Sequence, residues 1–190
     1  MQNAFHNFTL TIAGGTQFMK RWREYSLIGF AVLAITCSAA LTVSAQDRGV
    51  VLTDPELARV VPTAFYFKGQ SAPTQMRNSA AARFGSNRFV IAGMVDTSGY
   101  SSDIRERYQG FLITDSAITI NGSDLPVGAY GFGFSSDAKL KIFDLAGNEI
   151  LSVDTKTEPR IKLPRPLMMT STDSGIRLYS GREYAVIAPK

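Results

Sequence analysis

The polar segment from Asp96 to Arg107 (DTSGYSSDIRER) carries side chains whose types could bind a ligand. Asp96 and Asp103 supply carboxylates on either side of a glycine. Tyr100 supplies a flat ring, which we expect to be exposed because its neighbours are all polar loop residues. Connections of this length between strands are often functional or mobile. We therefore take Asp96, Tyr100 and Asp103 as candidate ligand-binding residues.

The carboxylates in and after this segment suggest two chemistries. Glycoside hydrolysis uses a pair of carboxyl groups that face each other across a cleft, and Ca²⁺ prefers oxygen ligands. The acidic residues available for such a pair are Asp96, Asp103, Glu106, Asp115 and Asp124. Their spacing singles out no catalytic pair, and the segment lacks the dense Asp and Asn ladder of a calcium loop. We predict no catalytic residue, metal or cofactor, and keep a carboxylate-based hydrolase acting on glycans as an alternative function.

A second group of candidates lies in the segment from Leu125 to Phe134 (LPVGAYGFGF). Its alternating positions place bulky residues on one face of a strand and small residues on the other. The bulky set is Tyr130, Phe132 and Phe134, and the small set is Ala129, Gly131 and Gly133. Glycines inside a strand often mark the close approach of a ring, a backbone or a ligand. Tyr130, Gly131 and Gly133 are therefore candidate ligand contacts, and a cavity against the glycines would make the protein a carrier of a small apolar ligand.

The residues Leu125-Pro126-Val127-Gly128-Ala129-Tyr130 follow Ile118-Thr119-Ile120-Asn121-Gly122. This element resembles the L-P-x-G-x-Y segment of uncharacterised secreted bacterial β-sandwich modules and of some carbohydrate-binding-like accessory domains. The resemblance implies an exported β-sandwich. It transfers no functional residue.

The N-terminal region has the features of a secretory signal peptide. Lys20, Arg21 and Arg23 follow Met19, residues 27–43 are mostly apolar, and Val43-Ser44-Ala45 places small residues before a cut. We predict a signal peptide over residues 19–45, cleaved after Ala45. Residues 1–18 form an upstream extension, and Met19 is the alternative start. We expect a periplasmic or secreted protein; the alternative is a membrane anchor formed by residues 27–43, since a bilayer crossing needs roughly 20 apolar residues.

Cleavage would remove the single histidine, cysteine and tryptophan of the chain, which are His6, Cys37 and Trp22. Catalytic triads that need an imidazole and zinc sites built from Cys and His are then excluded. The leader contains three of the 20 basic residues and one of the 16 acidic residues, which leaves 17 against 15. This near balance argues against a nucleic-acid partner, which calls for a clustered basic face.

The remaining sequence predicts an all-β fold, a single antiparallel β-sandwich or barrel-like domain of about nine short strands over residues 63–190. Residues 46–62 form a leader arm, in which Asp54-Pro55-Glu56 predicts the start of one short helix. The alanine-rich segment 79–84 is expected to be a helical turn or a loop. Asn121-Gly122 predicts a tight hairpin turn. The proline-rich segment 155–166 predicts a crossover or an edge strand, and the residues from Arg165 to Met169 could contact a membrane or a partner.

These features favour an exported, non-enzymatic β-sandwich that acts as a binding or envelope-associated accessory domain. Its expected partner is an envelope component or a glycan. Contact with a membrane is expected only through the leader, if the leader is not cleaved.

The intact mass of the protein recovered from membrane, periplasmic and medium fractions tests the predicted leader. We expect a mass that begins at Gln46, because the small residues before it satisfy the cleavage rule. A mass that retains residues 19–45 would instead show a membrane-tethered domain.

Overall fold

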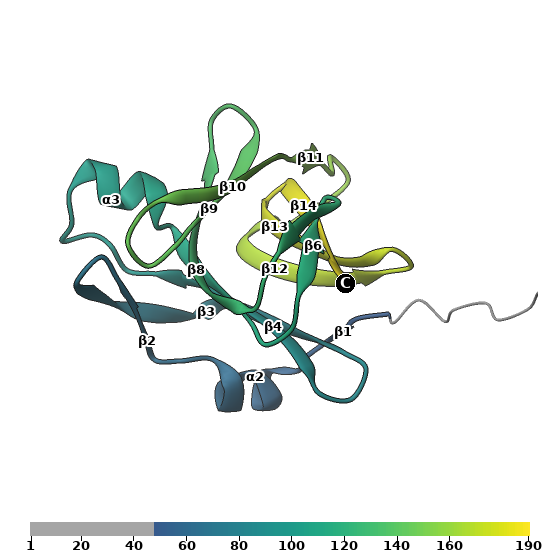
Figure 1. Ribbon diagram of the computed structural model, residues 1–190. Coiled ribbons are helices and arrows are strands. Elements are labelled where there is room, and N and C mark those ends of the chain that lie inside the picture. Colours follow the sequence, from purple (N-terminus) through teal and green to yellow (C-terminus); the bar gives the residue numbers. More distant parts are fainter. Residues whose placement is uncertain (1–47) are drawn as a thin grey trace, which may run out of the picture. The chain divides into compact units, whose positions relative to one another are not determined.

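The computed structural model describes residues 48–190, which fold into two antiparallel sheets (Figure 1). Ala45–Lys190 form one compact unit. The predicted upstream extension and signal peptide, and with them any anchor over residues 27–43, lie outside the described residues. Within the described part of the chain, no helix is long and apolar enough to cross a bilayer.

The larger sheet has eight strands. They are β1 (Val50–Val51), β2 (Ala64–Phe67), β3 (Gln70–Phe84), β4 (Arg88–Val95), β5 (Gly110–Thr114), β8 (Gly128–Ser135), β9 (Lys139–Phe143) and β10 (Glu149–Asp154). Their order is β1-β3-β4-β5-β8-β9-β10, and β2 pairs with the first part of β3. Apart from β1, the strands lie in the sheet in the order in which they occur along the chain, and the connection from β5 to β8 passes through β6 and β7 of the other sheet.

The smaller sheet has six strands. They are β6 (Ile118–Ile120), β7 (Ser123–Leu125), β11 (Lys156–Thr157), β12 (Arg165–Thr172), β13 (Gly175–Gly181) and β14 (Glu183–Pro189). Their order is β12-β13-β14-β6-β7, and β11 pairs with the other end of β14. The two sheets stay separate, so the predicted β architecture is confirmed as a pair of sheets, and the barrel-like alternative is wrong. The structure also contains more strands than the nine expected, because several strands are only two or three residues long.

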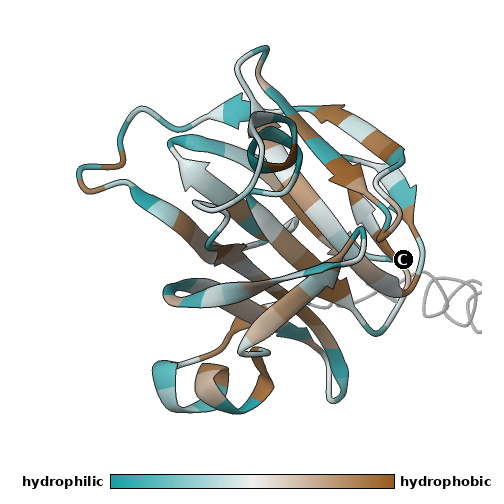
Figure 2. Ribbon diagram, turned by 90° about the vertical axis from the view of Figure 1, so that its left-hand side faces the viewer, coloured by the Kyte–Doolittle hydropathy of each residue, from teal (hydrophilic) through white to brown (hydrophobic). Residues whose placement is uncertain are grey.

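The main hydrophobic core lies between the two sheets. Phe132 and Leu112 from the larger sheet and Ile176 and Leu178 from the smaller sheet are fully buried in it. Figure 2 shows apolar residues along the strands and hydrophilic residues in many of the connecting loops. The apolar side chains of the strands supply the layer between the two sheets, as expected for sheets that pack face to face.

A second hydrophobic core covers the outer face of the larger sheet. Phe65 and Phe67 of β2 pack there against Phe111 and Tyr108, with ring centroids 5.0 Å apart for Phe65 and Phe111 and 4.2 Å apart for Phe67 and Tyr108. The β2–β3 hairpin therefore folds across the sheet, and Lys68 at its tip donates a backbone hydrogen bond to the carbonyl of Leu145 (2.6 Å). The larger sheet is thus buried on both faces.

Two short helices border this second core. The helix predicted in the arm is present as α2 (Asp54–Val60), with Thr53 as its N-cap and Pro55 in its first turn. The backbone N–H and hydroxyl of Thr53 both donate to the Glu56 carboxylate (2.9 and 2.8 Å). The segment expected to be a loop between β4 and β5 contains α3 (Ser102–Arg107). Sequence reasoning missed α3 because this helix is too short to show an apolar period.

The expectation of a helical turn or loop at residues 79–84 is wrong, because these residues form the second half of β3. Alanine favours helices intrinsically, but tertiary packing overrides that preference. Ala81 and Ala82 are fully buried, and β12 of the other sheet lies close to β3. Small side chains on β3 permit that approach.

The chain enters the sandwich at Gly49, which is buried. A Cβ atom there would lie 2.5 Å from the Ile176 side chain and 2.7 Å from the Phe84 ring. The Ser171 hydroxyl donates to the carbonyl of Gly49 (2.6 Å). Gly49 is therefore fixed between the two sheets immediately before β1.

The predicted division of β8 into a bulky face and a small face is confirmed. Tyr130 and Phe132 point into the main core. On the opposite face, a Cβ atom at Gly131 would lie 2.1 Å from the Tyr108 ring, and one at Gly133 would lie 2.6 Å from the carbonyl oxygen of Glu106. The group that approaches these glycines is the chain itself.

Replacing Gly131 with alanine should destabilise the fold by about 2 kcal/mol or more, because the added methyl group overlaps a buried ring. Urea unfolding of Gly131→Ala and of Gly99→Ala measures the difference. Gly99 is the control, since a Cβ atom there meets nothing within 4 Å. Equal stability of the two variants would contradict the packing of Tyr108 on β8.

Candidate functional site

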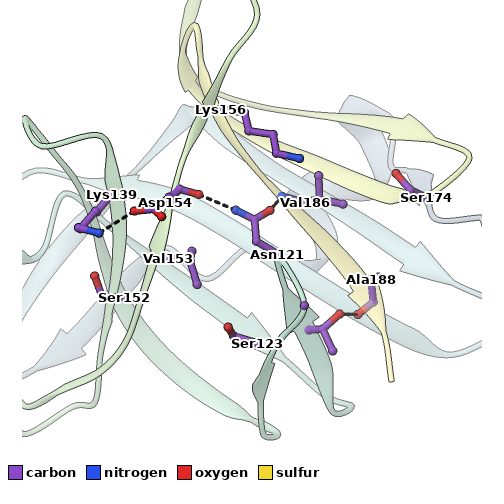
Figure 3. Close-up of a pocket in the computed structure, with 12 residues that line it drawn as sticks. Asn121, Ser123, Lys139, Ser152, Val153, Asp154, Lys156, Ser174, Val186 and Ala188 are labelled. Carbon is purple, nitrogen blue, oxygen red and sulfur yellow. Dashed lines mark hydrogen bonds and ion pairs between the residues drawn. The ribbon is translucent and has the colours of Figure 1, made fainter.

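A polar groove of about 760 Å³ lies where the edge of the larger sheet meets the smaller sheet. It is bordered by β9 and β10 on one side and by the β6–β7 turn, β11 and β14 on the other (Figure 3). Four of its lining residues bear hydroxyl groups, and two bear ammonium groups. They are Thr119, Ser123, Ser152, Ser174, Lys139 and Lys156. The groove is therefore rich in hydrogen-bond donors and acceptors.

Asn121 holds the walls of this groove together. Its backbone N–H donates to the carbonyl of Val186, and its side-chain oxygen accepts from the N–H of Val186, both at 2.8 Å. Its side-chain N–H₂ donates to the carbonyl of Asp154 (2.7 Å), as Figure 3 shows. Asn121 thus pairs with β14 in the gap between β6 and β11 and also links β14 to the end of β10. One side chain connects the two sheets.

The backbone conformation of the turn explains how Asn121 can bond to both β14 and the end of β10. Asn121 and Gly122 both have positive φ angles, 48° and 86°, as the predicted tight hairpin turn requires. Asparagine tolerates this conformation better than other residues with a side chain. The turn therefore directs a hydrogen-bonding amide toward β10 and β14.

The charges in the groove are partly neutralised. The Lys139 ammonium group lies 2.6 Å from the Asp154 carboxylate, and this hydrogen bond raises the pKa of Lys139 above its usual value. Lys156 is exposed and forms no ion pair with a described residue. One ammonium group is therefore available to a ligand.

The side chains predicted from the polar segment lie elsewhere. Asp96 is exposed, and the backbone N–H of Ser98 donates to its carboxylate (3.0 Å), which lowers the pKa of Asp96. Asp103 is exposed in the first turn of α3. Neither residue lines the groove.

The expectation that Tyr100 is exposed is wrong. Its ring is half-buried against Phe67 (centroids 6.1 Å apart), and its hydroxyl donates to the carbonyl of Ser71 (2.6 Å). Tyr100 pins the connection after β4 to the β2–β3 hairpin. No local pattern in the sequence indicates that this hairpin folds over the segment.

The predicted contacts on β8 are buried in the fold. Tyr130 is 8% exposed, its hydroxyl donates to the carbonyl of Pro126 (2.9 Å), and burial raises its pKa. Gly131 and Gly133 face Tyr108 and the end of α3, as described above. The space in which an apolar ligand would lie against the two glycines is filled by these groups.

Of the carboxylates considered for glycan hydrolysis, Asp103 and Glu106 lie one turn apart on α3, and the others lie on other parts of the chain. Asp115 accepts a hydrogen bond from the N–H of Phe89, at the start of β4, whereas Asp96 follows the end of that strand, roughly 20 Å away at the rise of a β-strand. Asp124 on β7 pairs with Lys190 (2.6 Å). In the described part of the chain, no three acidic, histidine or cysteine residues cluster as metal ligands would.

The sequence contained part of the signal for the groove. Asn121-Gly122 was recognised as a turn, but the partner strands of a side chain in that turn cannot be inferred from one sequence. Ser152 and Ser174 lie in different sheets, on β10 and in the β12–β13 turn, and line one groove only because of the packing of the two sheets. Comparison with known proteins finds no family model, curated protein or solved structure that matches the chain. Functional inference therefore depends on the groove itself.

Removing the Asn121 side chain should loosen the junction of the two sheets. Asn121→Gly keeps the positive φ angle at low cost but deletes two side-chain hydrogen bonds, and should lower the free energy of unfolding by about 1–3 kcal/mol. Urea unfolding would be compared with that of Asn87→Gly, an exposed residue in the β3–β4 turn. If both variants lose the same stability, the bridging role of Asn121 is disproved.

Proposed function

We propose that the chain is an exported, non-catalytic binding module that holds a hydroxyl-rich ligand, a glycan chain of the cell envelope, in the groove beside Asn121. The observation that carries this proposal is the concentration of hydroxyl and ammonium groups from both sheets around one hollow. Sugar hydroxyls both donate and accept hydrogen bonds, and so do the serine and threonine hydroxyls of the groove.

The size of the groove supports this proposal. Ligand sites commonly enclose about 300–1,000 Å³, and this hollow has about 760 Å³. Strands β9 and β10 border it on one side and β11 and β14 border it on the other.

The rigidity of the groove also supports binding. Asn121 is bonded to both Val186 and Asp154, and the N–H of Thr155 donates to the carbonyl of Ala138 (2.7 Å). These bonds fix the crossover from β10 to β11 before any ligand arrives. A preformed site loses less conformational entropy on binding than a flexible one.

The ion pair formed by the acidic residue of the groove favours binding without catalysis. Asp154 is the one carboxylate among the described residues that line the groove, and it is engaged by Lys139 at 2.6 Å. Glycosidases of the two-carboxylate type place their acids about 5–9.5 Å apart across the scissile bond. The hydrolase alternative would need its second acid from outside the lining residues.

The free ammonium group of Lys156 should favour a ligand that carries a negative charge. We expect an acidic trisaccharide, such as an alginate trimer, to bind residues 46–190 more tightly than the neutral trimer cellotriose. Lys156→Gln should weaken binding of the acidic trimer about fivefold, the effect of roughly 1 kcal/mol for an exposed charge pair. Binding of the neutral trimer should be unchanged. Arg77→Gln, which removes an exposed cation of β3 outside the groove, is the control.

A steric variant locates the binding site. Amide chemical shifts in the ¹⁵N spectrum should move at residues 121–123, 152 and 186 when the trimer is added. Ser152→Trp, on an exposed position of β10, should abolish these shifts, whereas Ser98→Trp in the connection after β4 should not. Shifts confined to residues 96–106, with binding lost in Ser98→Trp, would overturn the assignment of the groove.

A further inference from the structure

The connection between β11 and β12 forms a projecting basic loop. It leaves β11 beside the β13–β14 turn, where the N–H of Glu158 donates to the carbonyl of Arg182 (2.9 Å). It returns at Arg165, which pairs with Gly181 of the same turn. The loop and the turn therefore form one end of the smaller sheet.

This end of the molecule gathers cations around one exposed apolar side chain. Leu163 is 86% exposed, more than any other large apolar residue described. Arg160, Lys162, Arg165 and Arg182 are all exposed. We name these five residues the basic tip.

The acids next to the basic tip are already engaged within the fold. Glu158 lies 3.6 Å from Arg177, and its carboxylate also accepts from the N–H of Arg160 (3.3 Å). Glu183 accepts from the hydroxyl of Thr155 (3.2 Å). No described acidic residue forms an ion pair with a cation of the basic tip, and the four cations outnumber the one nearby carboxylate without an ion pair, that of Glu183, so the tip presents a net positive charge to solvent.

The loop holds Leu163 outward without help from a partner. Pro159, Pro164 and Pro166 fix their own φ angles and restrict the residues before them. The ends of the loop are tied to the β13–β14 turn, and Arg177, which holds Glu158, lies 4.6 Å from the centre of the Tyr184 ring. The exposed leucine is therefore presented at a low entropic cost.

We propose that the basic tip binds the surface of an anionic phospholipid bilayer. The four cations contact the headgroup phosphates, and Leu163 inserts into the boundary between headgroups and acyl chains. Clustered basic residues are attracted to anionic leaflets, and an apolar side chain adds hydrophobic burial to that attraction. A soluble polyanion would satisfy the charges but would leave Leu163 in water. The combination of four cations with one projecting leucine therefore favours a bilayer.

Vesicle sedimentation tests this proposal. Residues 46–190 contain both hydrophobic cores, so this part of the chain can be used without the leader, which would bind membranes itself. We expect it to sediment with vesicles of phosphatidylcholine and phosphatidylglycerol at low salt, and not with vesicles of phosphatidylcholine alone. Binding should fall as the salt concentration rises, since the charges are exposed.

Two pairs of variants separate the apolar and electrostatic contributions. Leu163→Ser should weaken partitioning into the anionic vesicles about tenfold, as loss of a buried leucine predicts, whereas Leu145→Ser, in the exposed β9–β10 turn, should not. Lys162→Glu should weaken partitioning about thirtyfold, since the reversal removes one attraction and adds one repulsion of roughly 1 kcal/mol each, whereas Arg77→Glu, on an exposed part of β3, should leave it nearly unchanged.

Three results would overturn the proposal. They are absence of sedimentation with anionic vesicles, equal binding to vesicles of phosphatidylcholine alone, and binding that is unaffected in Leu163→Ser. The last result together with tight binding to heparin would identify the tip as a polyanion site. Ser152→Trp, which blocks the groove, should leave vesicle binding intact, so this test stands apart from that of the proposed glycan site.

Discussion

Burial of the larger sheet on both faces is the constraint on which the rest of the structure depends. One face packs on the smaller sheet, and the other is covered by the β2–β3 hairpin with its aromatic rings. On a strand that is covered on both sides, a bulky side chain meets packed neighbours on either face. Strands β4, β5 and β8 therefore place glycine where a ring from a neighbouring segment must lie, as with Gly93 beside Phe111 and Gly131 beside Tyr108. The glycines that suggested a ligand site are explained by this packing.

Where a strand has no neighbouring strand to pair with, Asn and Gln residues pair with its backbone N–H and C=O groups. Asn121 supplies both the donor and the acceptor that Val186 would otherwise find on a neighbouring strand. Gln109 does the same for Phe134, whose N–H donates to the amide oxygen (3.0 Å) and whose carbonyl accepts from the amide nitrogen (2.8 Å). Buried backbone groups must be paired somewhere. At Asn121 this requirement also shapes a groove, because the amide reaches a strand of the other sheet.

The sequence predicted local elements better than the contacts between them. The two faces of β8, the turn at Asn121-Gly122 and the start of α2 were expected as the structure shows them, because alternation, turn residues and helix caps act locally. Tyr100 was misjudged because the β2–β3 hairpin that covers it lies far away in sequence. The groove was missed for the same reason: Asn121, Ser152 and Ser174 meet through long-range pairing, which a single sequence does not encode locally.

The burial of Gly49 bears on the order of events during export. If the leader ends at Ala45, as the sequence predicts, Gly49, which packs against Ile176 and Phe84, is the fourth residue after the cut, at most about 14 Å away when the chain is fully extended. A peptidase that binds several residues after its cleavage site would have to displace Gly49 from the folded domain. The corner between β1 and β12 would therefore close only after the leader has left, which makes seating of the N-terminus one of the last steps of folding.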